Sequence, residues 1–200
     1  MIYWNDMFEI KILLGYLSVI LGFIAYGLYF NDIFKNRIRP HVFSWLIWGI
    51  ITGIAFTVQV IKGGGAGAWA TGTGSIICFL IGFFAFSRGE KYFSSYDWAS
   101  LITALLSIVI WFLTNNPTGS VILLSIIDVV GSVPTLQKIY REPNGESAKS
   151  FFIHSIKFII ALFALQTYSL TTWLFPATLA VVNAIIALAI LIRRRQISVI

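Results

Sequence analysis

Residues 173–192 have the sequence WLFPATLAVVNAIIALAILI, and three arginines, Arg193, Arg194 and Arg195, follow it directly. A helix crosses the apolar core of a bilayer in about 20 residues, which is the length of this uncharged stretch. The stretch therefore predicts a membrane-spanning helix. The arginines predict that this helix ends at the cytoplasmic surface, where basic residues accumulate.

Six further stretches share this apolar character, so the sequence predicts an all-α integral membrane protein with seven transmembrane helices. The predicted spans cover approximately 11–30, 41–61, 68–87, 98–114, 119–137, 150–168 and 173–192. We expect the lipid bilayer to surround them. Loops must be short, because seven spans of about 20 residues occupy most of a chain of 200 residues.

The composition excludes several classes of protein. Hydrophobic residues make up 58% of the chain and charged residues 11%, and the mean hydropathy is +0.86. Soluble domains carry about 25% charged residues, so a soluble enzyme and a disordered chain are both excluded. A single cysteine, Cys78, excludes an intramolecular disulfide and a metal site built from cysteines.

The lysines and arginines predict the orientation of the chain. With the N-terminus outside, 11 of the 14 basic residues fall in cytoplasmic loops or at the C-terminus. The positive-inside rule then predicts an outer N-terminus and a cytoplasmic C-terminus, and we expect the plasma (inner) membrane. The formal net charge of +6 follows from this topology, so we expect no nucleic-acid partner.

A weak internal repeat divides the chain into two similar halves. Residues 30–48, FNDIFKNRIRPHVFSWLIW, and residues 136–158, LQKIYREPNGESAKSFFIHSIKF, both lead from a helix end through a basic loop into a new span. We therefore predict a parallel 3+1+3 repeat, an arrangement in which transporters place their site between the halves. Residues 1–96 form the first three-helix bundle, 97–117 a linker helix and 118–200 the second bundle.

Residues 131–152, GSVPTLQKIYREPNGESAKSFF, resemble the conserved segment of PQ-loop and SWEET-type transporters. The seven-span plan with an outer N-terminus is similar to that of SWEET and PnuC-like proteins over the whole chain. The sequence departs from the family pattern at Thr135, where a glutamine would follow the proline. The resemblance implies a transporter that moves a small polar solute by alternating access. It implies a sugar-like solute from SWEET proteins, or a vitamin- or nucleoside-like one from the PnuC type.

Two charged residues, Asp128 and Lys157, are predicted to lie deep inside the membrane. Buried charges cost about 2.5–3.5 kcal/mol each on insertion and are usually functional. Because they lie on consecutive spans, an ion pair between them is one hypothesis, with either a coupling role or a purely structural one. Snorkelling of Lys157 to the inner headgroups is the alternative.

Polar and aromatic residues on helix faces predict where the solute binds. Lys157 and His154 share a face, and the repeat matches them to Trp48 and Trp45. The resemblance implies a substrate contact for Asn183, because SWEET-type proteins carry an asparagine on the third helix of each bundle. The repeat places Cys78 at the equivalent position. The predicted substrate-binding residues are Trp45, Trp48, Trp69, His154 and Asn183, and the predicted hinges are Pro134 and Pro176.

One other function class stays open at the level of sequence, and a second, a membrane enzyme, is not supported. A seven-helix sensor or receptor is the main alternative, although Lys157 is not on the last span, where retinal proteins carry their lysine. We expect no enzyme activity, since no nucleophile has an adjacent base. We likewise expect no resident cofactor and no metal site. A homo-oligomer remains an option.

Overall fold

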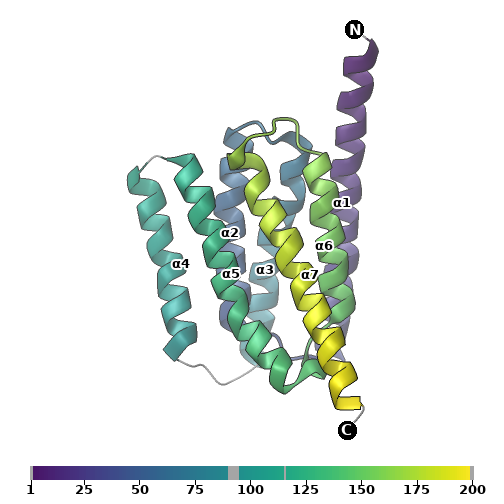
Figure 1. Ribbon diagram of the computed structural model, residues 1–200, viewed down its shortest axis with the longest axis vertical. Coiled ribbons are helices and arrows are strands. Elements are labelled where there is room, and N and C mark those ends of the chain that lie inside the picture. The colour runs from purple at the N-terminus through teal and green to yellow at the C-terminus, as the bar shows by residue number, and fades with distance from the viewer. Residues whose placement is uncertain (1, 90–94, 115, 199–200) are drawn as a thin grey trace.

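The computed structural model describes residues 2–89, 95–114 and 116–198, and these ranges are almost entirely helical (Figure 1). The long helices are α1 (Ile2–Phe34), α2 (Val42–Ile61), α3 (Trp69–Arg88), α4 (Ser95–Thr114), α5 (Pro117–Arg141), α6 (Ala148–Phe163) and α7 (Leu170–Ser198). The short 3-10 helices η1 (Gly65–Ala68) and η2 (Pro143–Gly145) precede α3 and α6. Within the described ranges, five helices are long and apolar enough to cross a membrane, which supports an all-helical membrane protein.

Two helices, α5 and α2, begin at residues whose side chains cap them. The side chain of Asn116 accepts a hydrogen bond from the Gly119 N–H at 3.1 Å, and Pro117 follows at the first helical position of α5. Both features are typical of a helix start. The imidazole of His41 caps α2 in the same way, by accepting from the Ser44 N–H at 3.4 Å.

Among the long helices of the described ranges, α6 is the one that ends short of its predicted span. The sequence predicts a helix over 150–168, whereas α6 ends at Phe163 and has 16 residues. Ala164 and Leu165 are fully buried after the helix has ended. The apolar character of these two residues therefore reflects burial against the rest of the protein and not a continuing span.

The order of the helices in space is the same in the two halves of the chain. Helix α3 packs between α1 and α2, and α7 packs between α5 and α6. The halves meet where α1 lies against α6 and where α2 lies against α5, while α4 packs on the outside against α5 and α2. Successive helices alternate in direction, so the two termini lie at opposite ends of the bundle, which we call the N-terminal end and the C-terminal end (Figure 1).

Candidate functional site

A buried pocket lies between the two halves, near the middle of the helices. Among the described residues, every long helix except α4 contributes to it, and the space measures about 40 Å³. That is enough for about three water molecules. The lining residues are Tyr26 from α1, Trp45, Trp48 and Thr52 from α2, Cys78 from α3, Asp128 from α5, Phe151, His154 and Phe158 from α6, and Leu179, Val182, Asn183 and Ile186 from α7.

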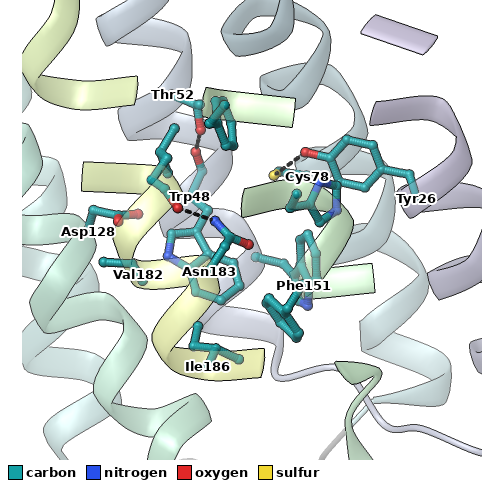
Figure 2. Close-up of a pocket in the computed structure, with 13 residues that line it drawn as sticks. Tyr26, Trp48, Thr52, Cys78, Asp128, Phe151, Val182, Asn183 and Ile186 are labelled. Carbon is teal, nitrogen blue, oxygen red and sulfur yellow. Dashed lines mark hydrogen bonds between the residues drawn. The ribbon is translucent and has the colours of Figure 1, made fainter. Parts of the chain in front are cut away.

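Five of the residues predicted from the sequence line this one pocket: Trp45, Trp48, Asp128, His154 and Asn183. Four other predicted residues do not line it: Trp69, Pro134, Lys157 and Pro176. Figure 2 shows Asp128 on one side of the pocket, with Tyr26 and Cys78 on the opposite side.

Aromatic rings form much of the wall. Trp45 and Trp48 lie one turn apart on α2, so they share a face, and their ring centroids are 5.2 Å apart at right angles. Across the pocket, Tyr26 packs on His154 with a centroid distance of 4.2 Å. Such walls offer flat apolar faces and cation-binding π surfaces to a bound solute.

Several polar atoms that face this space are buried without a partner. Both carboxylate oxygens of Asp128, both ring nitrogens of His154 and the indole nitrogen of Trp48 find no hydrogen-bond partner among the described residues. A buried polar group without a partner costs about 1–3 kcal/mol, and a charge costs more. Unsatisfied groups from three helices around one pocket therefore mark it as a candidate binding site.

Asp128 and Lys157 do not form an ion pair in this structure. Helix α7 lies between α5 and α6, which carry the two residues. Lys157 is fully buried, so it does not snorkel to the surface. Its ammonium lies 3.5 Å from the Tyr26 hydroxyl, 4.7 Å from the centre of the Tyr26 ring and 4.3 Å from that of Phe158. Aromatic faces therefore take the place of a carboxylate beside this cation.

Asn183 and Cys78, which the sequence repeat matches to each other, both line the pocket. The Asn183 amide nitrogen donates to the Leu179 carbonyl of its own helix at 2.7 Å. The Cys78 sulfur lies 3.8 Å from the Tyr26 hydroxyl. Cys78 is thus the thiol of the chain that borders the pocket, and it is buried.

Trp69 and the two helix prolines have other positions. Trp69 begins α3 at the N-terminal end and packs on Tyr16, with ring centroids 5.0 Å apart. Pro134 is buried within α5, and Pro176 lies within α7. A proline removes the hydrogen bond to the carbonyl four residues earlier. For Pro176 this is the carbonyl of Thr172.

The N-terminal end of the pocket is closed by neutral groups from both halves. Gln59 on α2 donates from its amide nitrogen to the Thr172 carbonyl of α7 at 2.9 Å, so it satisfies the group that Pro176 leaves free. The Gln166 N–H donates to the Gly64 carbonyl at 3.2 Å. A Cβ at Gly67 would lie 2.7 Å from the Ala161 carbonyl oxygen, so only glycine permits this approach of η1 to α6.

The C-terminal end is closed by a charged cluster. Lys138 and Glu146 form a salt bridge of 2.7 Å, with 5% and 2% of their side chains exposed. Tyr29 donates to the second Glu146 oxygen at 2.8 Å, and Lys138 donates to the Arg39 carbonyl. Two serine hydroxyls add contacts across the same boundary, Ser147 to Asp32 and Ser150 to the Ala25 carbonyl, both at 2.8 Å.

The polar residues of this arrangement that sequence reasoning missed include Tyr26, Tyr29, Gln59, Lys138 and Glu146. Glu146 and Lys138 belong to segments that the charge count assigns to a cytoplasmic loop, and nothing in that count distinguishes buried from exposed charges. Gln59 was detectable, because it is an amide near the end of an otherwise apolar span.

In the described ranges, no group of three His, Cys, Asp or Glu residues is arranged to hold a metal ion. Comparisons of the chain with protein-family models, with curated proteins and with solved structures give no match. The site must therefore be interpreted from its own chemistry.

Proposed function

We propose that this protein is a membrane transporter that moves a small polar solute by alternating access between α1–α3 and α5–α7, with α4 as a linker. The observation that carries the proposal is the aromatic-lined pocket between the two halves, which contains unpartnered polar groups and lies between contacts that cross the boundary at both ends. Transporters built from repeats bind their solutes at such a boundary, near the bilayer midplane.

The arrangement of the helices supports a parallel repeat of the 3+1+3 type. The third helix is central in each half, and exchanging the halves converts the α1–α6 contact into the α5–α2 contact. None of the described residues of α4 lines the pocket, as expected for a linker. Two similar units that meet around a central site can open alternately at either end.

The pocket chemistry points to a solute with a flat ring and hydrogen-bond donors. Aromatic walls suit the ring, and the unpartnered carboxylate of Asp128 accepts hydrogen bonds from its polar groups. Vitamin- and nucleoside-like solutes fit this description, and a sugar-like solute offers the hydrogen-bond donors without a flat ring. The space of about 40 Å³ is far below the roughly 300 Å³ of a typical ligand pocket, so the halves must separate to admit one.

The orientation follows from the charges at the two ends. Arg39, Arg141, Lys149 and the arginines at 193–195 lie toward the C-terminal end, so we assign this end to the cytoplasm. Within the proposal, the N-terminal end opens to the outside of the plasma (inner) membrane. The transport step breaks no covalent bond of the solute.

A two-stage experiment tests the proposal. Purified protein is first screened against sugars, nucleosides and vitamins by thermal shift, because a ligand that binds only the folded state raises the melting temperature. The best ligand is then loaded into proteoliposomes and its flux is measured. Asp128→Asn should lower binding and flux, whereas Ser125→Ala should preserve both, because the Ser125 hydroxyl donates to the Val121 carbonyl of its own helix.

The two stages separate the two function classes. Binding followed by flux supports a transporter. Binding without flux, in liposomes that retain folded protein, would contradict the proposal and favour a seven-helix sensor. Wild-type flux in the Asp128→Asn variant would remove Asp128 from the site.

A further inference from the structure

In the charged cluster at the C-terminal end, both charged groups belong to one half of the protein and each has a neutral partner in the other. Lys138 and Glu146 both belong to the second half, on α5 and just after η2. The groups that they bind across the boundary are the Tyr29 hydroxyl and the Arg39 carbonyl, which belong to the first half. Separation of the halves therefore breaks the crossing hydrogen bonds but leaves the ion pair together, so that no isolated charge is created.

Tyr29 connects this cluster to the wall of the pocket. Its hydroxyl donates to Glu146 at 2.8 Å and accepts from the Trp45 indole N–H at 3.2 Å. The Tyr29 and Trp45 rings also pack together, with centroids 4.8 Å apart. Because Trp45 lines the pocket, one hydroxyl lies between the solute-facing wall and the buried ion pair.

Hydrogen bonds in such a chain strengthen one another. A hydroxyl that accepts a hydrogen bond becomes a better donor, and the effect is larger away from water. Tyr29 is 1% exposed, so its hydroxyl is shielded from water and this strengthening applies to it. If the Trp45 indole turns toward a solute, the Tyr29 hydroxyl loses its donor and its bond to Glu146 weakens.

We propose that the Trp45–Tyr29–Glu146 chain is a latch that holds the C-terminal end shut and that is released when Trp45 moves. Its role in transport rests on the proposed function, but the closure itself does not. The N-terminal end is held by separate, neutral contacts of Gln59 and Gly64. The two closures share no residue, so each can be opened by its own substitution.

The protein contains its own probe for opening. Cys78 is the single cysteine of the sequence, and it is buried at the pocket. A membrane-impermeant thiol reagent reaches it only when one end opens. Protein reconstituted in one orientation allows the reagent to be applied to either face, and Cys78→Ser gives the blank.

Tyr29→Phe is the main test, because it keeps the ring and removes only the bridging hydroxyl. We expect labelling of Cys78 from the C-terminal face to become about fivefold faster, the change that follows from losing one hydrogen bond. Labelling from the N-terminal face should stay at the wild-type rate. The matched control, Gln59→Leu, should show the reverse pattern.

A second variant keeps the proposal falsifiable if Tyr29→Phe does not fold. Trp45→Phe preserves an aromatic wall but removes the indole donor, so it should increase labelling from the C-terminal face by a smaller factor. Unchanged labelling from that face, in a folded sample of either variant, overturns the latch. Equal increases from both faces also overturn it, because they indicate general loosening.

The same experiment distinguishes the latch from the proposed function. Labelling needs no solute and no transport. The face-specific response in a protein that moves no solute would retain the latch and reject the transporter, whereas solute flux with unchanged labelling would do the opposite.

Discussion

At the scale of single residues, Asp128 is the clearest case of a side chain that lowers the stability of the fold and that a bound solute could use. Its side chain is 1% exposed, and neither oxygen has a partner among the described residues. Folding gains nothing from such a group, since burial of an unpaired polar atom is unfavourable. Sites that bind ligands often retain a cost of this kind, because the ligand later supplies the missing contact.

Replacing Asp128 by Asn removes the charge at nearly constant shape. We expect the melting temperature in detergent to rise by roughly 2–4 °C, which corresponds to about 1 kcal/mol for a protein of this size. Binding of the best ligand should weaken at the same time. Circular dichroism melts with and without ligand measure both effects, and a lower melting temperature would show that Asp128 has a stabilising partner.

Lys157 differs from Asp128, because its charged side chain is packed tightly against neighbouring residues. A Cβ at Gly22 would lie 3.2 Å from the Lys157 Cδ, and the ammonium touches the Tyr26 and Phe158 rings. The long stem of this lysine therefore fills space between α1, α3 and α6. Its contribution to packing can be separated from its contribution of charge by two substitutions.

We expect Lys157→Met to melt at or above the wild-type temperature, because methionine keeps an unbranched stem and removes a buried charge. Lys157→Ala should melt at least about 5 °C lower, because a large-to-small change in a core costs about 2–5 kcal/mol. If both variants lose the same stability, the ammonium itself holds the helices together and the packing argument fails.

At the scale of helices, Gln59 on α2 satisfies a carbonyl that Pro176 leaves without a donor in α7. Pro176 leaves the Thr172 carbonyl without its usual donor, and the Gln59 amide on α2 supplies one. The proline thus creates a bonding site between the halves, in addition to any bend that it introduces into α7.

This relation can be measured with a double-mutant cycle. Gln59→Leu alone should cost about 1–3 kcal/mol, because it leaves a buried carbonyl unsatisfied. In a Pro176→Ala background the cost should fall by about 1 kcal/mol, since the substitution restores the intrahelical N–H that the proline lacks. Additive effects in thermal or denaturant unfolding would mean that Gln59 does not serve the Thr172 carbonyl.

Helix positions were largely predictable, because apolar length reports directly on membrane spans. The predicted start of α3 at residue 68 differs by one residue from the observed start at Trp69. The end of α6 was not predictable from hydropathy, because Ala164 and Leu165 are apolar for a different reason, namely burial in a turn. Hydropathy does not distinguish an apolar residue that faces lipid from one that faces protein.

At the scale of the whole molecule, neighbours in sequence are not always neighbours in space. The predicted pair of Asp128 and Lys157 assumed that consecutive helices touch, but α7 lies between them. The repeat matched Trp45 and Trp48 to His154 and Lys157, and of these four residues all except Lys157 line the pocket.

The proposed orientation gives a direct prediction for the whole chain. In a Cys78→Ser background, Lys62→Cys should react with an impermeant thiol reagent at the outer face of cells, and Asn144→Cys should react only in inverted vesicles. Both positions are exposed, Lys62 directly after α2 and Asn144 within η2, at opposite ends of the bundle. Labelling of both from the same face would contradict the orientation and the positive-inside argument.

The unequal lengths of α6 and α1 have a consequence for the surrounding lipid. With 16 residues α6 is about 24 Å long, which is less than the hydrocarbon thickness of about 30 Å. Its neighbour α1, with 33 residues, extends for about 50 Å. In the proposed seven-span arrangement, we expect acyl chains beside α6 to be compressed or tilted, and those beside α1 to remain extended. We therefore expect a locally thinner bilayer beside α6, where the length of the acyl chains would change the energy difference between two conformations of the bundle.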